Sequence, residues 1–338
     1  MNESTAISFA TTPMWVGFIA FVLVMLALDL FVFGGRKAAR VRVGEAAAWV
    51  GVWVSLAFAF AGLLWWMLDA SHGAEVARTK TFEFLAGYLI EQSLSIDNMF
   101  VFVMIFGYFA VPPELQRRVL LYGVLGAIVM RAGMILAGVW LVQQFAWVLY
   151  LFGAFLVITG IKMVMFAEAE PDLGKNPLLR WLRGHLRITP EFQGEKFFVR
   201  QNGLLWATPM FLVLVLIEAS DVVFAVDSIP AIFAVTTDPF IVFTSNIFAI
   251  MGLRALYFLL ADMADRFHLL KYGLAIVLVF IGGKMLVMPW FHVPVQWSLA
   301  VVGSIILVSV VASLLLSRRR AAAAASDDGA GRTLIGSD

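Results

Sequence analysis

Acidic side chains recur inside strongly apolar stretches of the sequence, where they could bind a cation. The carboxylates in question, with the polar residues that follow two of them, are Glu91, Asp97, Asn98, Glu218, Asp221, Asp227 and Ser228. Carboxylate and amide oxygens are hard ligands, which suit Mn²⁺, Mg²⁺ or Ca²⁺ better than copper or zinc. A charged group at bilayer depth costs a few kcal/mol. We therefore interpret these residues as a site for a divalent cation.

The spacing of these residues predicts which of them face together. Glu91 and Asn98 are seven residues apart and share a helix face, and Asp221 and Ser228 repeat that relation. Pro230 removes a backbone donor and crowds the preceding turn. We expect the backbone around 226–230 to be unwound, with carbonyls free to act as ligands.

Two arginines, Arg131 and Arg254, also lie inside apolar stretches. Set against the five carboxylates, they leave about three negative charges if every acid ionises, which is too much charge to bury uncompensated. One divalent cation and one proton would bring the sum to zero, and carboxylates that share a site titrate together. Both arginines could instead be only structural counter-ions. Asn246 could be a ligand or could join helices by hydrogen bonds.

The composition excludes several classes of protein. Of 338 residues, 62% are hydrophobic and 14% are charged, against about 45–50% and 25% in soluble domains. The chain is therefore predicted to be an integral membrane protein. Its net charge of +1 argues against a nucleic-acid partner, and the absence of cysteine excludes disulfides, thiolate nucleophiles and iron–sulfur clusters. No protease or metallohydrolase motif lies at membrane depth, so we expect neither an enzyme nor an organic cofactor.

Hydropathy predicts an all-α fold of nine transmembrane helices. The apolar runs are 14–33, 46–68, 82–109, 119–142, 147–166, 204–227, 239–261, 269–288 and 297–316. With nine spans, Lys and Arg outside them and at the start of the eighth divide about 18 to 2 between the two sides. The positive-inside rule then places the N-terminus outside and the C-terminus in the cytoplasm. We expect a bacterial inner (plasma) membrane protein.

The polar residues within the spans recur in a fixed order. An acid follows another after six residues in both EQSLSIDN and DVVFAVDS, and a buried arginine follows each time. LVITGIKMVM (156–165) and LVFIGGKMLV (278–287) then match, and the three offsets are 130, 123 and 122 residues. Three helices reverse the direction of the chain, so the second unit would be inverted, a common plan of secondary transporters.

This repeat divides the chain into predicted regions. They are two N-terminal helices (1–81), the first repeat (82–166), a cytoplasmic loop with a short amphipathic helix (167–203), the second repeat (204–288), a last helix (289–316) and a disordered tail (317–338).

The strings IEASDVVFAVDSIPAIFAVTTDPFIVFTSNIFAIMGLRALYFLL (217–260) and EQSLSIDNMFVF (91–102) resemble the TerC family of integral membrane proteins, in its Alx-like branch. The resemblance covers the second to the ninth span, and the acidic positions show no departure from it. It implies a manganese exporter, with a family history of tellurium resistance. It also implies that Glu91, Asp97, Glu218, Asp221 and Asp227 contribute to metal transport, together with Asn98.

The leading hypothesis is proton-coupled export of Mn²⁺, with Ca²⁺ or Mg²⁺ as other candidate ions. It requires both helix triplets to bring their anionic side chains into one oxygen-lined pocket at the bilayer midplane. An exporter of small organic cations is one alternative. A second is a membrane-protein assembly or insertion factor that docks partners on 167–203. The sequence leaves the oligomeric state open, and a homodimer is compatible with it.

Overall fold

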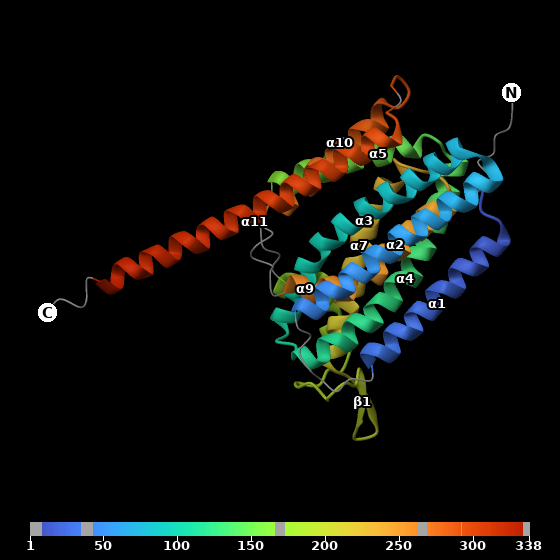
Figure 1. The fold of residues 1–338 in the computed structure, drawn as a ribbon. Helices are drawn as coiled ribbons and strands as arrows, with labels where there is room; N and C mark the ends of the chain where they lie inside the picture. The colour runs from blue at the N-terminus through green and yellow to red at the C-terminus, as the bar shows by residue number, and fades with distance from the viewer. Residues whose placement is uncertain (1–8, 35–42, 166–172, 262–268, 292, 334–338) are drawn as a thin grey trace.

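The computed structural model describes residues 9–34, 43–165, 173–261, 269–291 and 293–333. The basic cluster at 36–42 that contributes to the predicted orientation, Arg266 and the last five residues of the predicted tail lie outside the described residues. The described chain is almost entirely helical, as predicted, with one two-stranded hairpin (Figure 1).

Six helices and one 3₁₀ turn make up the described chain as far as residue 185. Their bounds are α1 (Thr12–Gly34), α2 (Val43–His72), α3 (Ala74–Tyr108), α4 (Pro113–Gln144), α5 (Val148–Met165), a 3₁₀ turn (Leu173–Lys175) and α6 (Pro177–His185). Among them, α3, α4 and α5 contain the first predicted repeat. A β-hairpin and five helices follow. Their bounds are β1 (Phe198–Gln201), β2 (Leu204–Ala207), α7 (Pro209–Phe233), α8 (Pro239–Met251), α9 (Leu253–Ala261), α10 (Leu270–Val287) and α11 (Val295–Thr333).

Seven of the described helices are long and apolar enough to cross a membrane. The pair α8–α9, bent by 42° at Gly252, provides an eighth span if it is counted as one. The described apolar part of α1, Thr12–Leu28, is shorter than these. The structure therefore supports a multi-pass membrane protein with seven to eight candidate spans, and the ninth stays a prediction.

Two features of the connection 173–207 differ in how well the sequence predicts them. The amphipathic helix expected there is α6, which buries Leu179 and Leu182 and exposes its arginines. The start of the sixth span at residue 204 is wrong, because residues 204–207 pair with 198–201 in the hairpin. Asn202 and Gly203 form its turn with φ of +52° and +77°, which matches the Asn-Gly preference of two-residue hairpin loops.

The unwinding predicted at Pro230 is also wrong. Helix α7 continues through Pro230 to Phe233, and Pro230 itself is buried. A proline can remain inside a transmembrane helix when packed neighbours support the freed backbone group. No carbonyl ligands near Asp227 therefore arise from a broken helix.

Helix α11 extends past residue 317, where the sequence predicts a disordered tail. The helix runs to Thr333 and projects away from the bundle in Figure 1. Its last part is rich in alanine and arginine, which are strong helix formers.

The central helices pack in an antiparallel manner. Gly87 of α3 lies against Ile232 of α7, at the C-terminal end of that helix. Further along α3, Met99 lines a small internal cavity together with Ile217 and Asp221, from earlier positions in α7. Increasing residue numbers on α3 therefore meet decreasing numbers on α7.

Helices α5 and α10 also cross closely and antiparallel, side by side in Figure 1. Glycines allow the contact, because a Cβ atom on Gly160 would lie 2.8 Å from the Ala275 carbonyl oxygen. A Cβ on Gly282 would lie 2.6 Å from the Gly153 carbonyl oxygen. The two backbones touch at both points.

Candidate cation site

Arg131, in the middle of α4, is the centre of a buried polar cluster. Its Nε and Nη2 atoms donate to the two carboxylate oxygens of Asp221 at 3.2 and 2.9 Å. Its Nη1 atom donates to Oε1 of Glu91 and lies 3.3 Å from Asn246 Oδ1 and 3.5 Å from Ser228 Oγ. Helices α3, α4, α7 and α8 thus converge on one guanidinium group, which is itself fully buried.

The polar residues on each helix reach this cluster because of helical periodicity. Asp221 and Ser228 share a face of α7, as the seven-residue spacing predicts, and both point to Arg131. Asn246 also donates from Nδ2 to the Val242 carbonyl one turn earlier, which fixes its Oδ1 toward Arg131. Asn246 therefore contacts the arginine and its own helix rather than a second acid.

The electrostatic balance of the cluster is incomplete. Two carboxylates, Glu91 and Asp221, share the single guanidinium group of Arg131. Glu91 is fully buried, and among the described residues its Oε2 atom has no hydrogen-bond partner. A buried carboxylate oxygen without a donor is costly. This oxygen could accept a proton or coordinate a cation.

The acids six residues further along each helix lie outside this cluster. Asp97 follows Glu91 by about 9 Å along the axis of α3, and the ammonium group of Lys271 on α10 acts on it electrostatically. Asp227 follows Asp221 by the same rise on α7 and hydrogen-bonds to Thr159 of α5. Because α3 and α7 are antiparallel, Asp97 and Asp227 lie on opposite sides of the Arg131 cluster.

Three further predicted residues are not among the partners of Arg131. Glu218, one turn before Asp221, packs against Gly126 of α4, where a Cβ atom would collide with the carboxyl group. Arg254 of α9 is 7% exposed and lines the small internal cavity that Asp221 also borders. Asn98, on the same face of α3 as Glu91, is buried as well.

The predicted single pocket is therefore not assembled in this structure. Within the described ranges, no three His, Cys, Asp or Glu side chains lie close enough together to hold a metal ion. The structure brings Glu91 and Asp221 together through Arg131 and distributes the other acids along the helix axes on either side.

Three residues next to the acids were missed by sequence reasoning. Lys271 reads as a loop cation near a span end, Thr159 as an ordinary polar residue of an apolar helix, and Gly126 as packing. Thr159 and Gly126 each contact an acid on another helix, and Lys271 acts electrostatically on one. The spacing along one helix carries no information about such neighbours.

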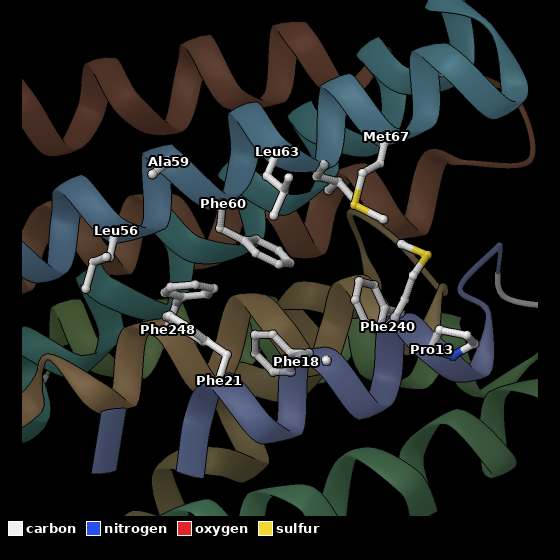
Figure 2. A pocket seen from close by; sticks show the side chains of 13 residues that line it. Pro13, Phe18, Phe21, Leu56, Ala59, Phe60, Leu63, Met67, Phe240 and Phe248 are labelled. Carbon is white, nitrogen blue, oxygen red and sulfur yellow. The ribbon is translucent and has the colours of Figure 1, made fainter. Parts of the chain in front are cut away.

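A larger cavity of about 370 Å³ lies elsewhere, between α1, α2 and α8. Figure 2 shows that its lining side chains are carbon and thioether groups, with Phe18, Phe60 and Phe248 at the centre. Since its lining includes no carboxylate, amide or hydroxyl side chain, it offers no hard ligand for a cation.

Comparisons with known proteins agree with the resemblance seen in the sequence. The model of the "Integral membrane protein TerC family" matches residues 76–321, which include every residue of the cluster. A protein of Escherichia coli (strain K12), named "Putative membrane-bound redox modulator Alx", is 58% identical over 301 residues, 89% of this chain and 94% of that protein. An "Uncharacterized membrane protein STKORF319" of Myxococcus xanthus is 48% identical over 305 residues, 90% and 93% of the two chains.

No solved structure gives a significant match. The family match covers well over half of the chain, and the relatives are aligned over nearly their whole length. The apolar helices agree with the names of the two relatives, of which one is called membrane-bound and the other a membrane protein. This chain is therefore an integral, multi-pass membrane protein of the TerC family.

Proposed function

We propose that the protein is a secondary transporter that exports a divalent cation, Mn²⁺ first among them, through the carboxylates around Arg131. The observation that carries this proposal is the buried pair of Glu91 and Asp221, which share one guanidinium group inside apolar helices. Ionisable groups at this depth are costly and are usually functional. Their oxygens are of the type that hard cations prefer.

The order of the acids along the bundle is that of a transport path. The positive-inside rule predicts a cytoplasmic C-terminus in a bacterial inner membrane. In that orientation Asp97 lies on the cytoplasmic side of the central pair and Asp227 on the outer side. A cation leaving the cytoplasm would meet Asp97, then Glu91 with Asp221, then Asp227.

The contacts of α5 and α10 support the inverted repeat. Residues 156–165 correspond to 278–287, so Gly160 corresponds to Gly282 and Val157 to Val279. A Cβ on Gly160 would lie 2.8 Å from Cγ2 of Val279, and a Cβ on Gly282 would lie 2.9 Å from Cγ2 of Val157. Exchanging the two helices thus reproduces the same contact, as expected of two triplets related by a two-fold axis in the membrane plane.

Proton exchange is the coupling that the charges favour. Without a cation, two carboxylates and one guanidinium leave one negative charge, which a proton would neutralise. Binding of a divalent cation would release that proton, because coupled carboxylates titrate as a set.

The name of the Escherichia coli relative mentions redox modulation. This chain contains no cysteine, so it cannot act by thiol–disulfide exchange of its own side chains. Control of the supply of a redox-active ion such as Mn²⁺ would give a redox effect without such chemistry.

Flux into proteoliposomes tests the proposal. Purified protein is reconstituted around a Mn²⁺-sensitive dye, with and without a pH gradient, and Mn²⁺ influx is recorded. Asp221→Asn and Glu91→Gln should each reduce the rate at least about tenfold, as expected for loss of a group used in the transport step. Glu75→Gln is the matched control, since Glu75 is exposed in the first turn of the same helix α3.

The outcomes separate the alternatives. Equal flux in the native protein and in both site variants would refute the carboxylate site. Deletion of α6 and the hairpin should leave flux unchanged if the protein is a transporter, whereas an assembly factor that docks partners on this connection would lose its activity.

A further inference from the structure

We propose that Arg131 is an exchangeable counter-ion: its guanidinium group occupies the Glu91–Asp221 site when no cation is bound and leaves both carboxylates when the cation enters. This inference rests on the proposed transport function. It gives Arg131 a role beyond joining helices, because it makes the arginine a competitor of the transported ion.

The first argument is that arginine and cation need the same atoms. The guanidinium group engages Oδ1 and Oδ2 of Asp221 and Oε1 of Glu91. A divalent ion with oxygen ligands would coordinate these oxygens directly. Only Oε2 of Glu91, which has no hydrogen-bond partner within the described part of the chain, is open to a first contact with an incoming ion.

The second argument is charge. Two carboxylates neutralise one divalent cation, so an ion coordinated by Glu91 and Asp221 leaves no negative charge for the guanidinium group that engages them. A guanidinium group held against a bound divalent cation is repelled by it, and this repulsion is strong at short range in a low-dielectric interior. The two carboxylates therefore have two alternative occupants, the cation or the guanidinium group of Arg131.

The third argument is that the arginine has neutral acceptors to which it can move. Its Nη1 atom already lies 3.3 Å from Asn246 Oδ1 and 3.5 Å from Ser228 Oγ. A rotation of the side chain could keep these contacts and release the carboxylates. The fixed orientation of Asn246, held by its bond to the Val242 carbonyl, suits such an acceptor.

Binding of Mn²⁺ to the purified protein in detergent tests this role. Arg131→Gln removes the competitor and one positive charge, so its dissociation constant for Mn²⁺ should fall at least about tenfold, equivalent to about 1.4 kcal/mol. Its flux should fall at the same time, because the ion leaves the site more slowly. Arg131→Lys keeps the charge but loses the two-pronged geometry, so its dissociation constant for Mn²⁺ should lie between those of the native protein and of Arg131→Gln.

Arg183→Gln, on the exposed face of α6, is the matched control for loss of an arginine and should bind Mn²⁺ like the native protein. A purely structural arginine predicts the opposite sign, since a disordered site binds the ion more weakly. A folded Arg131→Gln variant with unchanged or weaker Mn²⁺ affinity would therefore overturn the proposal. If Arg131→Gln does not fold, the Mn²⁺ affinity of Arg131→Lys is measured instead, and an affinity no higher than that of the native protein would overturn the proposal. A native protein that neither binds nor transports Mn²⁺ would overturn the transport function as well, whereas native flux with unaltered affinity in the variant would overturn this inference alone.

Discussion

The crossing of α5 and α10 makes a quantitative prediction from two adjacent glycines. At Gly282 a Cβ atom would lie 2.6 Å from the Gly153 carbonyl oxygen and 2.9 Å from the Val157 backbone nitrogen. Ordinary contacts begin at 3.4 Å, so the helices would have to separate by several tenths of an ångström. At Gly283, the next residue, a Cβ would meet nothing within 4 Å.

Gly282→Ala and Gly283→Ala therefore form a matched pair. Both gain about 1 kcal/mol of helix propensity over glycine, and this gain cancels when the variants are compared. Overpacking at Gly282 costs about 1–3 kcal/mol. We expect Gly283→Ala to be neutral or slightly stabilising and Gly282→Ala to have a free energy of unfolding lower than Gly283→Ala by about 1–3 kcal/mol.

The assay is unfolding of the purified variants by SDS titration in mixed micelles, followed by tryptophan fluorescence. Gly160→Ala should behave like Gly282→Ala, because its Cβ would lie 2.8 Å from the Ala275 carbonyl oxygen and 2.8 Å from Val279 Cγ2. Equal stabilities of Gly282→Ala and Gly283→Ala would refute the close antiparallel crossing and the two-fold relation inferred from it.

Three further predictions concern the acids. Gly126→Ala places a Cβ 2.6 Å from Oε2 of Glu218, so it should displace that carboxyl and slow Mn²⁺ flux, whereas Gly133→Ala on the same helix meets nothing within 4 Å and should leave flux unchanged. Asp221→Asn removes the two-pronged partner of buried Arg131 and should lower the free energy of unfolding by about 3–5 kcal/mol. Glu91→Gln keeps the Arg131–Asp221 pair, so it should lower the free energy of unfolding by less in the same SDS titration. A larger loss for Glu91→Gln than for Asp221→Asn would contradict the geometry. The Thr236 hydroxyl donates to Glu83 at 2.6 Å, beside Lys80, so Thr236→Val should lower the free energy of unfolding by about 1–3 kcal/mol. Thr237→Val, at the exposed next residue, should leave the free energy of unfolding nearly unchanged. Equal losses in the two variants would count against the Thr236–Glu83 contact.

The positions of most helices follow from the sequence because a span needs about 20 apolar residues. The fifth apolar run, 147–166, matches α5 within one residue at each end. Apolar content fails where it does not distinguish helix from strand: Leu204 and Leu205 read as the start of a span but lie in the hairpin. The Asn202–Gly203 turn is the local signal that separates the two.

The site could be predicted only as far as one helix at a time. Periodicity places Asp221 and Ser228 on one face, and the structure directs both to Arg131. Which helices meet, and at what depth, depends on their packing, including the glycine contacts of α5 and α10. The separation of Asp97 and Asp227 to opposite sides of the cluster comes from the antiparallel packing of α3 and α7.

Anomalous scattering from crystals soaked in Mn²⁺ tests the central claim most directly. Transport through the central pair predicts a manganese peak between α3 and α7, within about 2.0–2.6 Å of carboxylate oxygens of both Glu91 and Asp221, with Arg131 turned away from them. Manganese peaks confined to the protein surface at saturating Mn²⁺, with the Arg131 contacts intact, would contradict it.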